Sequence, residues 1–211
     1  MADPHKISTV AQLRAVIGEE IPGLAEKNID QIDVFAREFI AKSPFVVLAT
    51  VDDQGRLDAS PKGDAPGFVE VADERTLLVP DRPGNKLAYG HLNVLSSGRA
   101  GLIFMIPETR KTLQVNGAAE LTADPQLLEQ LAARGKPATL VLRVQVEEVF
   151  FHCAKAFIRS NLWQPEQWPE PHKVSFGEMF AARRAQAAEG MAALSAQDID
   201  AAVDADYEHN L

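Results

Sequence analysis

Short β-rich segments separated by turn-forming residues occupy the middle of this 211-residue chain, and they constrain its fold more than any other feature. The first segment, residues 45–51 (FVVLATV), is apolar and β-branched, and the sequence DDQG that follows is typical of a hairpin turn. Further strands are predicted over residues 56–62, 67–71, 76–79, 100–106, 111–121 and 138–151. Many short strands with few connecting helices indicate a closed or half-closed barrel.

Helical patterns flank these strands on both sides. Apolar residues recur at helical spacing in the first 43 residues, and a capping box (SFGE, 175–178) precedes an alanine-rich stretch near the end. We therefore predict a mainly β fold with flanking helices (α+β). Its expected parts are an N-terminal helical segment (1–43) packed on the barrel, the barrel itself (44–165) and a C-terminal helical extension (166–211).

Composition and charge narrow the functional classes. Apolar residues make up 46% of the chain, yet the longest apolar stretches fall far short of the roughly 20 residues needed to span a bilayer. The N-terminus lacks the pattern of a secretory signal, and a single cysteine, Cys153, fits a reducing compartment. The net charge of −9 opposes binding to a phosphate backbone. We expect a cytoplasmic protein that binds neither nucleic acid nor membrane.

The common motifs for nucleotides, metals and nucleophiles do not occur in the sequence. There is no GxxxxGK[ST], no GxGxxG after a strand, no HExxH and no GxSxG. His152 precedes Cys153, but adjacent residues seldom orient for catalysis, so packing is the favoured interpretation. His91 lies among leucines and is interpreted as a partly buried structural residue. We predict no metal site and name no catalytic residue.

Two segments combine turn formers with cations at strand ends. The first is ASPKGDAPG (59–67), whose proline and glycines indicate a strand edge or bulge that turns side chains toward a ligand. The second is VPDRPGNK (79–86), where lysine in a first helical turn costs a few tenths of a kcal/mol unless an anion binds there. The alternative for the first segment is an irregular hairpin with a surface lysine. The alternative for the second segment is a solvent-exposed lysine at the helix start.

At this point the chain resembles a known family. The order FVVLATVDDQGRLDASPKGD, LLVPDRPGNK and AGLIFMIPETRKTLQVNGAAEL is similar to the FMN-binding split β-barrel of pyridoxamine 5′-phosphate oxidase-like proteins. The resemblance covers about residues 40–165. Within the family, the chain is most similar to a subgroup of uncharacterised flavoproteins that share SPKGD, PDRPGN and CAKAFIRSNLW. It implies a homodimer with FMN at the interface and an oxidoreductase activity on an unknown small molecule.

The resemblance also implies which residues hold the phosphate of FMN. Asn85 and Lys86 match the arginine–lysine pair that grips this phosphate in the oxidase, but asparagine carries no charge. Another cation must then replace the arginine. The candidates are Arg82, Arg110 and Lys111.

Other positions match the surroundings of the flavin ring. Ser60, Pro61 and Lys62 match a strand that runs along the ring, and Thr112 matches a polar residue near it. The second subunit is expected to contribute a further tract, comprising Lys155, Arg159, Ser160 and Trp163. For this tract the alternative is an amphipathic helix with a solvated basic face and a buried tryptophan at its end.

Two alternative functions remain at this stage. The protein could be a non-catalytic flavin carrier or sensor, or the same barrel could bind haem or a deazaflavin. True pyridoxamine 5′-phosphate oxidase activity is a weaker hypothesis, because the last third of the chain does not follow the oxidase's pattern.

Overall fold

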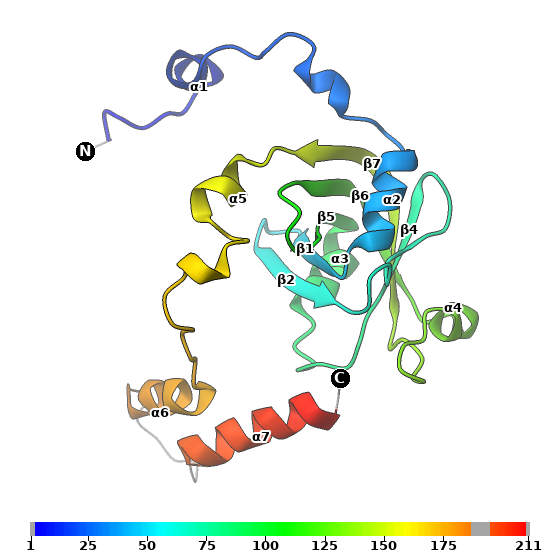
Figure 1. Ribbon diagram of the computed structural model, residues 1–211, viewed down its shortest axis with the longest axis vertical. Coiled ribbons are helices and arrows are strands. Elements are labelled where there is room, and N and C mark those ends of the chain that lie inside the picture. The colour runs from blue at the N-terminus through cyan, green and yellow to red at the C-terminus, as the bar shows by residue number, and fades with distance from the viewer. Residues whose placement is uncertain (1–2, 187–194, 210–211) are drawn as a thin grey trace.

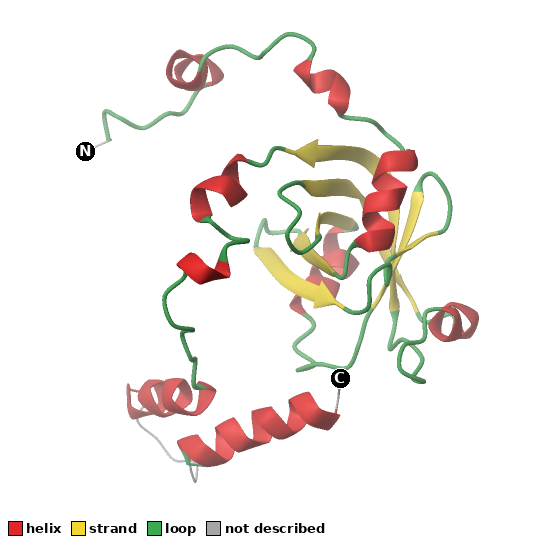
Figure 2. Ribbon diagram, viewed as in Figure 1, coloured by secondary structure: helices red, strands yellow, loops and turns green. Residues whose placement is uncertain are grey.

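The computed structural model describes residues 3–186 and 195–209. The described residues form a seven-stranded antiparallel sheet in the order β2-β1-β5-β6-β7-β4-β3, curved into a split β-barrel (Figures 1 and 2). The strands are β1 (Phe45–Val51), β2 (Leu57–Gly63), β3 (Glu70–Val71), β4 (Thr76–Pro80), β5 (Arg99–Met105), β6 (Thr112–Thr122) and β7 (Val141–His152). The predicted mainly β class with flanking helices is confirmed.

The core of the barrel lies on one face of the strands. In β1 the side chains of Val46 and Leu48 are buried, and their register partners on β5, Phe104 and Leu102, are buried with them. On β6 the predicted alternation is confirmed, because Leu113, Val115 and Ala119 are buried while their neighbours along the strand are more exposed. The period-2 pattern therefore fixes which face of each strand forms the core.

The strand predicted over residues 67–71 is shorter than expected and is reduced to β3. Gly67 has φ +82°, and its N–H donates to the carbonyl of Ser43 at 3.2 Å. A Cβ at Gly67 would lie 2.9 Å from the carbonyl oxygen of Ala41. The Pro66–Gly67 pair thus forms a turn packed tightly against the end of the helix at residues 34–42. A ladder of strand hydrogen bonds cannot begin there.

The pairing of β6 with β7 contains an irregularity at Asn116 and Gly117. There the two backbones approach so closely that a Cβ at Gly117 would lie 2.0 Å from the carbonyl oxygen of Gln145. Such a bulge bends and twists a long strand pair, and here it lies where β6 and β7 curve around the barrel.

The N-terminal helices differ in their contact with the barrel. Helix α2 (Val34–Lys42) is capped by Asp33, buries Ala36 and Ile40, and covers the barrel. Helix α1 (Val10–Ile17) has a capping box but buries none of its residues, and with the 3-10 turn η1 (Leu24–Lys27) it extends away from the strands (Figure 1). In this single chain α2 packs on the barrel and α1 does not.

Helix α3 (Tyr89–Ser97) connects β4 to β5 and lies against β1, β2 and β6. Leu87 just before the helix and Leu92 and Leu95 within it are all more than half exposed, whereas Gly90 and Val94 are buried. A Cβ at Gly90 would lie 3.1 Å from Asp58 Oδ2 on β2, so the absence of a side chain lets the helix approach this strand.

The C-terminal elements follow the predicted helix starts. Asp124 caps α4 (Pro125–Gln130), and Ser175 caps α6 (Phe176–Gln186) by accepting from the N–H of Glu178 at 3.0 Å. Between them lie α5 (Lys155–Ser160) and the turn η2 (Pro165–Gln167), which lead away from the barrel. Helix α7 (Ala196–His209) returns toward it, and the last two residues of the predicted acidic end lie outside the described residues.

Among the described helices, none combines the length and the apolar composition needed to cross a membrane.

Candidate cofactor-binding cleft

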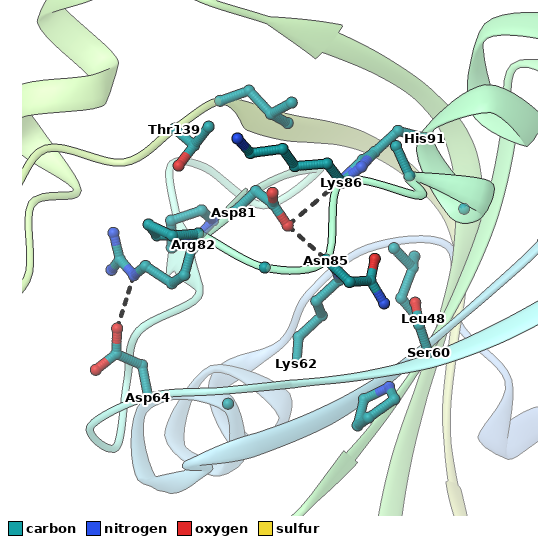
Figure 3. A pocket seen from close by; sticks show the side chains of 18 of the residues that line it. Leu48, Ser60, Lys62, Asp64, Asp81, Arg82, Asn85, Lys86, His91 and Thr139 are labelled. Carbon is teal, nitrogen blue, oxygen red and sulfur yellow. Dashed lines mark hydrogen bonds and ion pairs between the residues drawn. The ribbon is translucent and has the colours of Figure 1, made fainter. Parts of the chain in front are cut away.

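A cleft of about 1160 Å³ opens beside β2, between the loop that joins β4 to α3 and the loop that precedes β7 (Figure 3). This volume suits a cofactor-sized ligand. Its described lining includes five cationic side chains and four carboxylates. The cations are Lys62, Arg82, Lys86, Arg134 and Lys136, and the carboxylates are those of Asp58, Asp64, Asp81 and Asp206. In a chain with a net charge of −9, this cleft concentrates positive charge.

Two ion pairs connect the SPKGD segment with the PDRPGN segment. Lys62 Nζ lies 3.0 Å from Asp81 Oδ1, and Arg82 Nε lies 2.8 Å from Asp64 Oδ2 (Figure 3). Arg82 also donates from Nη1 to the carbonyl of Leu131 at 2.9 Å. Each segment thus supplies one cation and one carboxylate to the other, so the pairs hold the two walls of the cleft together.

The Arg82–Asp64 pair is the more enclosed of the two. Burial alone would raise the pKa of Asp64, but the N–H of Ala65, the guanidinium of Arg82 and the nearby charge of Arg134 together lower it below its ordinary value. Asp64 is therefore a carboxylate at neutral pH, and it holds Arg82 in the wall of the cleft.

The loop before α3 has an unusual backbone. Lys86 and Ala88 have φ of +61° and +54°, in the left-handed region that side chains rarely adopt. The side chain of Asn85 accepts from the N–H of Leu87 at 3.0 Å, and Ala88 provides no side-chain cap to α3. First-turn amides of α3 therefore receive no bond from a capping side chain at the edge of the cleft. Lys86 is exposed there and makes no ion pair with any residue in 3–186 or 195–209.

His91 also lines the cleft, which its sequence interpretation as a structural residue among leucines did not anticipate. Its Nε2 lies 3.5 Å from Asp81 Oδ1, the oxygen that also binds Lys62. Burial is the main cause that lowers the pKa of His91; Asp81 and Asp58 oppose this effect and Lys62 adds to it. The neutral ring is thus favoured while Lys62 is close.

Six of the predicted site residues meet in this cleft. They are Ser60, Pro61 and Lys62 on β2, and Arg82, Asn85 and Lys86 on the loop before α3. The sequence predicted both segments independently, and the fold brings them together.

The other seven predicted residues do not appear in the described lining of this cleft and form a second group. The indole of Trp163 stacks on Phe157 with ring centroids 5.7 Å apart and donates to the carbonyl of Thr109 at 2.9 Å. This bond joins the α5 tract to the turn that precedes β6. The second group therefore comprises Arg110, Lys111 and Thr112 from the turn and Lys155, Arg159, Ser160 and Trp163 from the tract.

Within the second group, the cations point to solvent. Arg110, Lys111, Lys155 and Arg159 are exposed, while Thr112 is buried at the start of β6 opposite His152. Trp163 is half-buried at the end of its tract.

Sequence reasoning did not name several charged or titratable residues of the cleft, including the following five. Asp64 and Asp81 stand inside the two motifs, and a carboxylate within two positions of each cation was the available signal. His91, Arg134 and Lys136 approach the cleft only because of the folded chain, so no local pattern indicated them. Among the described residues, no group of His, Cys, Asp or Glu is arranged to hold a metal ion.

A family model for pyridoxamine 5′-phosphate oxidase matches residues 32–153, which is more than half of the chain. The chain belongs to the pyridoxamine 5′-phosphate oxidase family. This membership agrees with the resemblance seen in the sequence and includes both cleft segments and the turn before β6. No curated protein matches the chain.

Solved structures with a similar fold include three of different description. A candidate pyridoxamine 5′-phosphate oxidase from Lactobacillus delbrueckii is 24% identical, with 58% of this chain and 95% of that chain covered and a TM-score of 0.46. An FMN-binding protein from Syntrophomonas wolfei is 13% identical (56% and 88% covered, TM-score 0.39). The haem storage protein HutZ from Vibrio cholerae is 17% identical (58% and 94% covered, TM-score 0.40). Likenesses this distant do not distinguish among ligands.

Proposed function

We propose that this family member binds FMN as a homodimer and acts as an FMN-dependent oxidoreductase on a small molecule in the cytoplasm. One observation carries the proposal. The thirteen residues that the sequence assigned to one flavin site fall into two separate groups, one in the cleft and one on α5 and the turn before β6. Two halves of one site on a single chain are what a site shared between two subunits requires.

The residues of the cleft fit the phosphate of FMN. Lys86 is exposed at the edge of the cleft beside the uncapped first turn of α3, and Arg134 and Lys136 line the same cleft. A cation with backbone amides at a helix start suits a phosphate monoester. Arg82, one candidate for the missing arginine, is bound to Asp64 and Leu131, so we assign it to the wall of the cleft. Lys86 with Arg134 would then carry the charge.

The strand β2 fits the flavin ring. Ser60 and Lys62 are register partners of the buried residues Leu48 and Val46, so they belong to the same face of the sheet, and Pro61 lines the cleft between them. A bound FMN supplies the redox chemistry, and the protein supplies binding, orientation and charge. Lys62 would place a positive charge near the ring, where it stabilises negative charge that develops on reduction. In the ligand-free cleft Asp81 holds that ammonium group.

The outward face of the sheet supports the homodimer. Val47 and Ala49 on β1 point away from the core, with Ile103 and Gly101 as their partners on β5, and none of these four residues is fully buried. Beside them Leu57, on the edge strand β2, is 84% exposed. An apolar sheet face of this kind favours a self-complementary two-fold contact. A second chain on this face would cover it, and the proposal requires the partner's α5 tract to reach the cleft.

A fluorescence titration of FMN into flavin-free protein tests this proposal. The Lys86→Met variant should bind FMN about 10- to 150-fold more weakly, since a charged hydrogen bond contributes roughly 1.5–3 kcal/mol. Lys42→Met is the matched control, because Lys42 pairs with Glu38 on the exposed side of α2. Absence of FMN binding by the unaltered protein, or equal affinity in all three proteins, would contradict the proposal. FMN binding without turnover of any reduced substrate would favour the flavin carrier.

A further inference from the structure

One carboxylate in the cleft is shared by two basic side chains. Asp81 Oδ1 lies 3.0 Å from Lys62 Nζ and 3.5 Å from His91 Nε2 (Figure 3). The 3.0 Å contact is a hydrogen-bonded ion pair, and 3.5 Å is at the limit of a hydrogen bond. Lys62 therefore binds this oxygen more closely than His91 does, and His91 lies beside the ion pair.

The shared carboxylate is shielded enough for its charge to matter. The side chains of Lys62, Asp81 and His91 are 24%, 17% and 13% exposed. Charges in such an environment interact more strongly than charges in bulk water. A change in the position of Lys62 would thus change the electrostatic potential at the imidazole ring of His91.

The charged groups around His91 come from three elements. Strand β2 supplies Lys62 and Asp58 and the loop before α3 supplies Asp81, while Lys86 of that loop and Tyr89 of α3 line the same cleft. Asp81 and Asp58 raise the pKa of His91 while burial and Lys62 lower it, with burial the largest cause. Lys62 is therefore the cation whose departure from Asp81 would favour the imidazolium.

We propose that Lys62 and His91 compete for Asp81, so that a bound ligand that engages Lys62 draws it away from Asp81 and His91 takes up a proton in its place. The proposal deepens the proposed function, because it adds proton uptake to the binding of an anionic cofactor or substrate at the same cleft. The proton comes from solvent. The imidazolium of His91 then supplies the positive charge beside Asp81, while the ammonium group of Lys62 binds the ligand.

The sign of the pH dependence follows from linkage. Because the ligand-bound state holds more protons than the free state, ligand affinity rises as the pH falls through the range between the two pKa values of His91. Burial keeps the pKa of His91 in the free protein below its ordinary value of 6.5, and the proposal predicts a higher pKa in the bound protein. Proton uptake is therefore expected between these two pKa values and should vanish at pH values well above both.

A histidine titration followed by NMR tests the competition without any ligand. The pKa of His91 should rise in Lys62→Met, since Asp81 then has only His91 as a partner, and it should fall in Asp81→Asn. Lys42→Met removes the same charge from a pair on α2 and should leave the pKa of His91 unchanged. The His91→Gln variant lacks the resonance of His91 and so identifies it in the spectrum. The same pKa in the unaltered protein and in folded Lys62→Met would overturn the proposal.

A calorimetric titration with FMN tests the coupling to the ligand. At pH 6.5, binding measured in two buffers of different ionisation enthalpy should show uptake of a fraction of one proton by the unaltered protein. His91→Gln should bind FMN with uptake close to zero. Binding of FMN without proton uptake, or with equal uptake in both proteins, would overturn the proposal. If FMN does not bind at all, the proposed function fails, and the NMR comparison still decides the competition for Asp81.

Discussion

Arg82 donates to the carboxylate of Asp64 across 2.8 Å, and this contact connects two segments that are 18 residues apart in the chain. The pair of Lys62 with Asp81 connects the same segments in the opposite sense. These two pairs give a structural reason for the cations that the sequence placed in both loops. They also separate Lys62 and Arg82, which are held by carboxylates, from Lys86, which is exposed at the edge of the cleft.

The pair of Arg82 and Asp64 is expected to stabilise the fold at neutral pH. Arg82→Met should lower the free energy of unfolding by about 1–3 kcal/mol, because the carboxylate of Asp64 is then left largely buried without its partner. Arg99→Met, which breaks an exposed pair with Glu147, should cost no more than about 1 kcal/mol. Urea unfolding of the three proteins measures both differences.

The pair of Arg82 and Asp64 also predicts that the free energy of unfolding depends on pH. The lowered pKa of Asp64 means that its contribution is present above its ordinary value of 3.8 and is lost as the pH falls toward the folded-state value. The difference in unfolding free energy between the unaltered protein and Arg82→Met should therefore narrow below pH 4. A difference that stays constant from pH 7 to pH 3 would show that the ion pair is not its origin.

The phosphate group of FMN is expected to account for the effect of Lys86. Unaltered protein should bind FMN more tightly than riboflavin, which has the same ring and no phosphate. In Lys86→Met the affinity for FMN should fall about 10- to 150-fold while that for riboflavin changes little. Fluorescence titrations with both ligands measure the two ratios. An equal loss for both ligands would place Lys86 near the ring and would be inconsistent with a phosphate contact.

Subunit mixing tests whether two chains share one site. Lys155→Met/Arg159→Met alters only the second group, and Lys86→Met alters only the cleft. Each variant alone should bind FMN weakly. Once their subunits are exchanged, about a quarter of all sites should regain full affinity, because each mixed two-fold dimer contains one site with both halves intact. No recovery after verified exchange, or full affinity in the double variant alone, would argue against a shared site.

The close approach of β6 and β7 predicts a sensitive glycine. Gly117→Ala should lower the free energy of unfolding by about 2 kcal/mol or more, because the added methyl group would lie 2.0 Å from the backbone oxygen of Gln145. Gly55→Ala is the control. Gly55 has φ +79° with no atom within 4 Å of the added methyl group, so only the backbone conformation is strained, at about 1 kcal/mol. Similar losses in thermal or urea unfolding would contradict the predicted contact.

Local pattern predicted most of the barrel because its strands are apolar runs or alternating segments and several of its turns contain glycine, proline or aspartate. The DDQG turn and the alternation of Leu113 and Val115 are of this kind. Local pattern did not predict which face of α3 is buried. At Gly90 the helix approaches β2 so closely that an added Cβ would lie 3.1 Å from Asp58 Oδ2, and such an approach depends on the fold rather than on helical spacing.

The candidate site was predicted in part for the same reason. The loops SPKGD and PDRPGN combine cations with turn formers, and this local signal pointed to both. Their mutual pairing, and the arrival of His91 and Arg134 at the same cleft, depend on residues distant in the sequence. The division of the predicted residues into two groups also became visible only once the strands were in order.

The absorbance spectrum of the purified protein tests the central claim most directly, with identification of any chromophore released by heat. The proposal of an FMN site predicts a yellow protein with two flavin bands and release of FMN in a ratio approaching one per chain. A Soret band would instead identify haem, and a released deazaflavin would identify that cofactor. A colourless protein that also fails to bind added FMN would contradict the account.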